Sequence, residues 1–224
     1  PDDRAGEIRV EQRAGNGEWT GYTAPVVLDQ DGSHALEFRA IDAAGNVSAA
    51  VPATAMVDRT VPAVSVTGVE AGRAYDVGTA LSLGATAADP ASGVASVVVE
   101  LDGERVQTPL SVAPTAGAHE LRVVATDEAG NAEEVRVPFA VAVTWDTAAD
   151  LLVSYRAEGR LGLASYLQLY VHLATAAHLS RAGLNRPAMA ALDRFTTVAN
   201  TVATAEVRAQ LVAIATALRA PLTG

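Results

Sequence analysis

The sequence predicts a multidomain β + α protein, with two antiparallel β-sandwich modules, the first truncated, followed by an antiparallel four-helix bundle. Three observations support this fold class. A fifteen-residue segment at residues 32–46 recurs at 117–131. Short stretches in which every second residue is apolar fill the first part of the chain, and from residue 145 this alternation gives way to helical spacing. The predicted domains are residues 1–57, 58–144 and 145–224.

The repeated segment is identical at eight of its fifteen positions. In both copies alternate residues are apolar, which places them on one face of a strand. Each strand then ends in Asp-x-Ala-Gly-Asn, where the aspartate can accept backbone N–H groups and the glycine can adopt a positive φ. A second strand follows near 47–57 in the first copy and near 134–143 in the second, so each copy predicts a β-hairpin.

Further short strands are predicted around these hairpins. They cover residues 7–12, 20–28 and 36–41 in the first module, and 64–66, 79–88, 96–101 and 105–110 in the second. The dipeptide Asp102-Gly103 is a strong hairpin turn between the last two. Many short strands separated by turns are typical of a β-sandwich.

The first module is shorter at its front than the second. Asp127 follows Asp58 by 69 residues, whereas the matching Asp42 has only 41 residues before it. About 28 residues, or roughly two strands, are therefore missing, which would expose a strand edge and a core face. We expect the chain to be a piece of a longer protein, with this module completed by upstream residues or by another chain. A version with about 30 more upstream residues should then melt at a higher temperature.

Four helices are predicted after Trp145, which we expect to wedge the bundle against the second sandwich. The first covers 147–158, with Thr147 or Asp150 as its cap and Gly159 as its stop. The second covers 163–182, and the others begin near Pro187 and after Thr204. The apolar stripe expected on the second helix consists of Leu163, Tyr166, Leu167, Tyr170, Leu173 and Ala177. Short loops between amphipathic helices favour an antiparallel bundle.

Composition excludes several classes of function. The net charge is −10, and all sixteen basic residues are arginine. Nucleic acids and anionic membrane surfaces would repel such a chain, so neither is an expected partner. No apolar run is long enough to insert into a membrane. The sequence has no cysteine, which excludes disulfides, thiolate metal sites and thiol nucleophiles.

Two parts of the chain resemble known families. The repeated segments, Trp19-Thr20-Gly21-Tyr22-Thr23-Ala24-Pro25 and Asp89-Pro90-Ala91-Ser92-Gly93-Val94, resemble bacterial Ig-like repeats of secreted exoenzymes and surface proteins. Residues 146–224 resemble the FIMAH domain, through Leu151-Leu152, Tyr155 and Gly159, then Leu169 and Leu173, then Gly183, Ala191-Leu192 and Phe195. The resemblance implies an extracellular accessory region at the C-terminus of a larger bacterial protein, whose catalytic domain could be a glycoside hydrolase or a polysaccharide lyase.

The residues themselves form no catalytic constellation. His34 and His119 occupy equivalent repeat positions in different modules, so they cannot share a site. His172 and His178 lie six residues apart on different faces of a helix, which is not the spacing of a metal pair. Acidic residues gather at turns rather than in pairs suited to glycoside chemistry. We therefore expect this chain not to be an enzyme.

Two kinds of ligand site are possible. Calcium is the most reasonable metal, because Asp89, Asp102, Asp127 and Asn131 offer oxygen ligands on loops, although these residues could simply shape turns. No other cofactor is expected.

Sugar rings could stack on Trp19, Tyr22 and Tyr75, although Trp19 and Tyr22 could instead pack locally. The favoured function is a spacer and attachment region that holds the parent's catalytic domain and contacts a polysaccharide or cell-surface component. The alternative is a carbohydrate-binding appendage that targets the parent hydrolase or lyase to its glycan.

Overall fold

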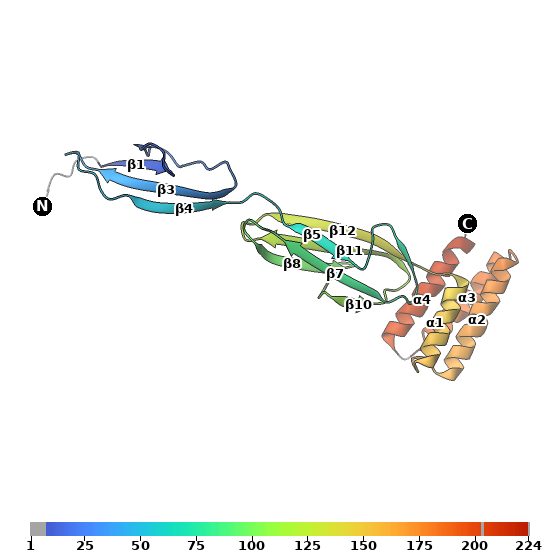
Figure 1. Cartoon of the computed structure of the whole chain (residues 1–224). Helices are drawn as coiled ribbons and strands as arrows, with labels where there is room; N and C mark the ends of the chain where they lie inside the picture. Colours follow the sequence, from blue (N-terminus) through green and yellow to red (C-terminus); the bar gives the residue numbers. More distant parts are fainter. Residues whose placement is uncertain (1–7, 203, 224) are drawn as a thin grey trace. The chain divides into compact units, whose positions relative to one another are not determined.

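The computed structural model describes residues 8–202 and 204–223 (Figure 1). The chain divides into two compact units. The first comprises Pro1–Ala63 together with Ala88–Ser96 and Ala125–Glu133, and the second comprises Val64–Ala87, Val97–Val124 and Glu134–Gly224. The predicted order of β modules followed by helices is confirmed.

The first module is a single antiparallel sheet in the order β2-β1-β3-β4. Its strands are β1 (Arg9–Ala14), β2 (Thr20–Gly21), β3 (Gly32–Ile41) and β4 (Val51–Val57). The strand expected over 7–12 thus begins at Arg9 and continues to Ala14, and Glu7 lies outside the described residues.

Two other strand predictions for this module were too long. The expected strand 20–28 is regular only over Thr20–Gly21. In the second module the corresponding residues Leu110–Val112 form a strand because they pair with β7 (Leu81–Ala88). The described residues of the first module include no counterpart of that partner strand. The expected strand 47–57 begins at Val51, because the Ser48 hydroxyl occupies the N–H of Ala40 and ends the regular ladder.

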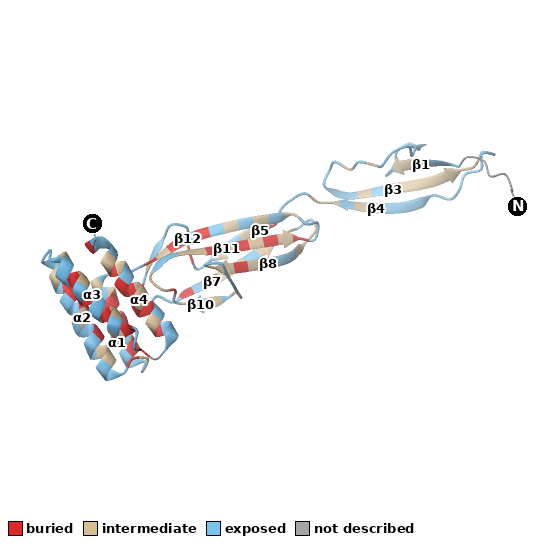
Figure 2. Cartoon of the chain, turned by 180° about the vertical axis from the view of Figure 1, so that it is seen from behind, coloured by how far each residue is buried: buried red, intermediate tan, exposed pale blue. Residues whose placement is uncertain are grey.

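None of the described residues covers one face of this sheet. Of residues 8–60, Leu36 alone has a buried side chain. Val51 is 63% exposed, whereas Val137, which precedes the matching proline in the second module, is 7% exposed. Figure 2 shows the difference as pale strands in the first module and red positions along β11 and β12. The completion of this module by other residues stays a prediction.

This difference predicts unequal effects of one substitution at two matched valines. Val137→Thr should lower the free energy of unfolding by about 1–2 kcal/mol, because the new hydroxyl would be buried. Val51→Thr should change it by less than about 0.5 kcal/mol. Urea denaturation followed by circular dichroism measures both. Equal losses would mean that Val51 is covered in solution.

The second module contains two sheets. The strands are β5 (Ala63–Thr67), β6 (Ala74–Asp76), β7 (Leu81–Ala88), β8 (Val94–Leu101), β9 (Glu104–Val106), β10 (Leu110–Val112), β11 (Gly117–Asp127) and β12 (Ala132–Ala142). The sheet orders are β10-β7-β5 and β6-β12-β11-β8-β9. The side chains of Leu83, Leu121 and Val123 are fully buried in the core. The predicted antiparallel arrangement does not hold for β6, which pairs with β12 in parallel.

The C-terminal part forms four helices: α1 (Trp145–Ala157), α2 (Leu163–Arg181), α3 (Asn185–Ala199) and α4 (Ala205–Arg219), with a final 3-10 turn at Ala220–Leu222. The cap expected at Thr147 or Asp150 is instead Thr144, whose hydroxyl accepts from the N–H of Thr147 while Thr147 accepts from the N–H of Thr144. This capping box moves the start of the helix to Trp145. Among the described helices none is long and apolar enough to cross a membrane.

The stripe predicted for α2 was partly wrong. Leu163, Leu167 and Tyr170 are exposed, and the buried positions are Leu169, Leu173, Ala176 and Ala177. The helix carries apolar residues on all sides, so spacing alone could not decide which face is buried.

Candidate metal centre

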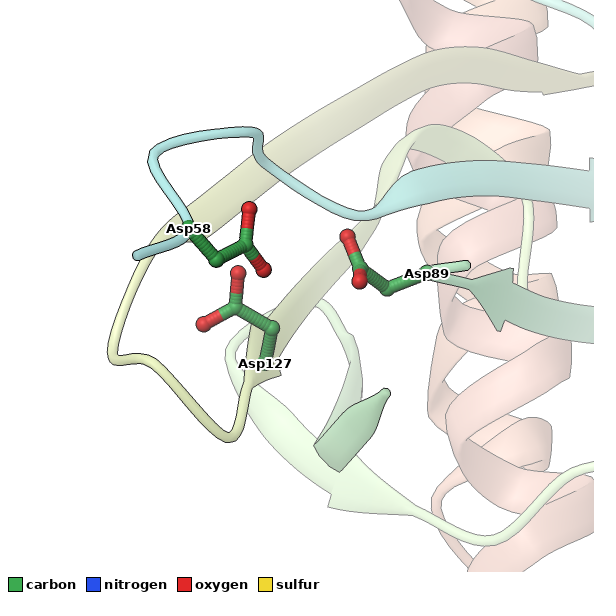
Figure 3. Close-up of side chains that lie close together, drawn as sticks. All are labelled: Asp58, Asp89 and Asp127. Atoms are coloured by element: carbon green, nitrogen blue, oxygen red, sulfur yellow. The ribbon is translucent and has the colours of Figure 1, made fainter. Parts of the chain in front are cut away.

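Three aspartates converge at one end of the second module. Each of Asp58, Asp89 and Asp127 offers a carboxylate oxygen, and these oxygens all lie within 4.8 Å of one another. Figure 3 shows the three carboxylates pointing toward a common point. They come from the segment before β5, the loop after β7 and the last residue of β11. All three lie within one compact unit, the first, because that unit includes the loops of the second module at 88–96 and 125–133.

Each aspartate is held in place by its own loop. Asp58 Oδ1 accepts the N–H of Thr60 at 3.0 Å, and Asp89 Oδ1 accepts backbone N–H groups of residues 91–93 at 2.9–3.2 Å. Asp127 accepts from Asn131 twice, through the backbone N–H at 2.7 Å and through Nδ2 at 2.8 Å. These bonds fix the carboxylates before any ligand binds.

Two oxygens of the cluster have no partner. Asp58 Oδ2 and Asp89 Oδ2 are both buried, and no described residue donates a hydrogen bond of good geometry to either. The nearby Ser92 hydroxyl and the N–H of Thr60 hold the pKa of the Asp58 carboxyl below its ordinary value, so this carboxylate stays charged. Asp127 is only 2% exposed. No ion pair between described residues includes any of the three aspartates. Asp58 and Asp89 are half-buried. Three carboxylates held this close together with little solvent and no compensating charge repel one another, and a divalent cation among them would remove that cost.

The donor set indicates which cation would fit. All candidate ligands are carboxylate oxygens. Hard cations such as Ca²⁺ prefer oxygen ligands, whereas softer metals prefer nitrogen or sulfur. The site offers no nitrogen or sulfur ligand. Three carboxylates close together suit the binding of such an ion.

The structure places the four predicted calcium ligands differently. Asp89 and Asp127 lie in the cluster. Asn131 lies beside it, with Nδ2 donating to Asp127 and also to the carbonyl oxygens of Asp58 and Thr60 at 3.1 and 3.2 Å. Asn131 therefore ties the segment around Asp58 to the turn that carries Asp127.

Asp102 lies outside this cluster. It lies in the turn between β8 and β9, where its N–H donates to Glu120 O near the start of β11, while Asp127 is at the end of that strand. Its carboxylate contacts His119 Nδ1 at 2.7 Å. Sequence reasoning missed Asp58, although its position at the opening of the second module was a usable signal.

The first module contains a counterpart of Asp127 outside any such cluster. Asp42 accepts from the side chain and backbone N–H of Asn46, at 2.7 and 2.8 Å. These bonds hold the pKa of Asp42 below its ordinary value. The same turn is thus built without a group of carboxylates around it among the described residues.

The aromatic residues predicted to contact sugar pack against other side chains of the protein. The ring of Trp19 has the guanidinium of Arg13 at 4.7 Å and that of Arg39 at 4.2 Å from its centroid. Tyr22 packs edge-on against Phe38.

Tyr75 likewise packs edge-on against Phe139, and its hydroxyl accepts the N–H of Glu70 at 3.0 Å. The three rings do not form a row of free faces.

The two repeat-equivalent histidines have structural partners. His34 Nε2 lies 2.7 Å from Gln30 O, and His119 Nε2 lies 2.6 Å from Thr115 O. In each module the ring thus contacts the carbonyl four residues earlier in the chain. This matches the structural role expected at the start of these strands.

We compared the chain with known protein families, with curated proteins and with solved structures. Residues 145–220 match the family model of the FIMAH domain, which confirms the resemblance predicted for the helices. A search of curated proteins found no match.

Among solved structures, the chain is similar to the fibronectin(III)-like modules of Clostridium thermocellum CbhA, with 22% identity, a TM-score of 0.33, and coverage of 59% of this chain and 77% of that one. It is also similar to Bacteroides ovatus SGBP-B, solved with a mixed-linkage heptasaccharide (15% identity, TM-score 0.21, 60% and 37% covered). A third is a Ca²⁺-stabilized ice-binding adhesin of an Antarctic bacterium (20% identity, TM-score 0.28, 62% and 41% covered). The chain thus spans less than half of the last two proteins.

Proposed function

We propose that this chain is a non-catalytic accessory region of a larger secreted bacterial protein, in which the Ig-like modules act as spacers and the FIMAH-like bundle as an attachment module. The repeated, chemically plain β modules and the FIMAH match support this role. The parent is a polysaccharide-degrading enzyme in this proposal, which rests on the resemblance of both parts to modules of such proteins. Turnover of a polysaccharide by the purified chain would contradict it.

The second part of the proposal is that Asp58, Asp89 and Asp127 bind a calcium ion that stabilises the accessory region. The observation that carries it is the pair of buried, partnerless oxygens on Asp58 and Asp89 beside a third buried carboxylate. A bound ion would join the segment before β5 to two loops of the second module. It would therefore stabilise the folded state without taking part in a reaction.

Calcium should raise the melting temperature of the full chain by several degrees. A ligand present at 100 times its Kd stabilises the folded state by about 2.7 kcal/mol. Asp58→Asn should abolish most of the shift, because it removes one charge while keeping an oxygen that can accept the N–H of Thr60. Differential scanning calorimetry with added calcium or with EDTA measures the effect.

Asp42→Asn is the matched control. It alters the same Asp-x-Ala-Gly-Asn turn in the first module, away from the cluster. The variant should lose some stability but keep the full calcium-dependent shift. A wild-type chain that melts at the same temperature in calcium and in EDTA would refute the calcium site, as would a shift that survives in Asp58→Asn.

A further inference from the structure

A second candidate site lies in the helical bundle, in a cleft between α1 and α2. The cleft has a volume of about 160 Å³. Its lining consists of Trp145, Asp146, Ala149, Tyr170, Leu173, Ala174, Ala177 and Arg181. A cavity of about 150 Å³ accommodates one six-membered ring. A pyranose with its hydroxyl groups is larger than benzene, so the cleft can take one face of a single sugar ring, with the remainder in water, and is too small for a large organic ligand.

Two aromatic side chains line this cleft from different helices. Trp145 is the first residue of α1, and Tyr170 lies near the middle of α2 with 41% of its surface exposed. The ring of Tyr170 packs at a tilt against Tyr166, with 5.8 Å between the ring centroids, and Tyr170 also lines the cleft. Alanines 149 and 174 are also part of the lining and leave room beside the rings. An aromatic ring combines a large apolar face with a polar tip, which suits contact with the C–H face of a pyranose.

The cleft also contains one acceptor and one donor that are only loosely paired. Arg181 Nη2 lies 3.3 Å from Asp146 Oδ1, which is longer than the 2.7–2.9 Å of a strong charge-assisted hydrogen bond. Both side chains are well exposed, 64% for Arg181 and 86% for Asp146, so their attraction is weak. A sugar hydroxyl can donate to the carboxylate while another accepts from the guanidinium.

Charge favours a neutral ligand. The chain carries a net charge of −10, which disfavours the approach of an acidic saccharide, while in the cleft itself the charges of Asp146 and Arg181 cancel. A protein partner packed flat over the cleft would have to remove water from both Asp146 and Arg181, whose long contact would compensate poorly. A neutral saccharide leaves part of both groups in water.

We propose that this cleft binds one pyranose ring of a neutral polysaccharide. The proposal goes beyond the spacer and calcium functions, and it assigns sugar contact to Trp145 and Tyr170 rather than to Trp19, Tyr22 and Tyr75. Binding at the cleft does not require the aspartate cluster. The two proposals can therefore fail separately.

Isothermal titration calorimetry of the full chain with cellohexaose, xylohexaose and mannohexaose tests this site, with hexagalacturonate as the acidic comparison. At least one neutral hexasaccharide should bind, and more tightly than hexagalacturonate. Tyr170→Ala and Arg181→Gln should each weaken that binding by about tenfold. Leu167→Ala is the matched control, because Leu167 is exposed on the same helix outside the cleft lining, and it should bind like wild type.

Several results would overturn the proposal. These are no binding of any of the three neutral hexasaccharides, tighter binding of hexagalacturonate, or unchanged binding by the Tyr170→Ala and Arg181→Gln variants. Melting of each variant, followed by circular dichroism, shows whether a loss of binding comes from the site or from unfolding. Because Arg181 is exposed, Arg181→Gln still tests the site if Tyr170→Ala unfolds at a lower temperature. Asp58→Asn should bind the saccharide like wild type, which separates this site from the calcium site.

Discussion

Phe195→Ala should lower the free energy of unfolding of the helical bundle by about 3–5 kcal/mol. Phe195 lies on α3 and is completely buried, as is Leu192, which lies three residues earlier on the same face of the helix. Removing the ring leaves a cavity that the surrounding side chains can fill only in part. Since natural domains are stable by only about 5–15 kcal/mol, much of the bundle's stability would be lost. Thermal melting followed by far-ultraviolet circular dichroism measures the change.

Leu163→Ala is the control for this prediction. Leu163 begins α2 and is exposed, so its truncation should change the free energy of unfolding by about 0.5 kcal/mol or less. If the two variants melted alike, the burial assigned to α3 would be wrong.

Gly68→Ala should destabilise the second sandwich by about 3 kcal/mol or more. The residue has a φ of +89°, and a Cβ added there would lie 2.0 Å from the carbonyl oxygen of Ser82 on β7. The left-handed conformation costs a non-glycine residue about 1–2 kcal/mol, and forcing apart two backbone segments adds at least a similar amount. Urea denaturation of the full chain, monitored by near-ultraviolet signals and circular dichroism, measures the loss.

Gly72→Ala separates the two contributions. Gly72 also has a positive φ, of +75°, but a Cβ there would meet no atom within 4 Å. This variant should lose only the conformational cost of about 1–2 kcal/mol. Similar losses for both glycines would show that β7 moves aside without cost.

The features that the sequence predicted well are local ones. The repeated hairpins depend on alternation and on the Asp-x-Ala-Gly-Asn turn, and both appear where expected. The helices depend on spacing and on stop signals such as Gly159 and Gly183, both of which have a positive φ of +74°. Such signals act between residues that are close in the chain, so they can be recognised in a single sequence.

The candidate metal site was only half predictable. Asp89 and Asp127 were chosen because they lie on loops, but Asp102 met the same criterion and lies near the other end of β11. Which loops converge depends on how β7 and β11 are arranged in two different sheets, and no local pattern encodes that. Asp58 was missed for the same reason.

The strand expected over 20–28 failed for a related reason. A strand is stable only when it has a neighbour to pair with. The sequence around Pro25 resembles that of β10, but β10 exists because β7 lies beside it. Comparison with the repeat indicated that about two strands are missing at the front of the module, and the length predicted for the strand over 20–28 did not take their absence into account.

The uncovered face of the first sheet has a consequence for the order in which the chain folds. The strands of the second sandwich follow one another without interruption from β5 to β12, so this module can fold as a unit during synthesis. The described residues of the sheet of β1–β4 do not bury its apolar face, so the prediction that other residues complete the module also predicts that its folding depends on contact with them. Without such a cover, Val51 and its neighbours offer a surface on which chains can associate.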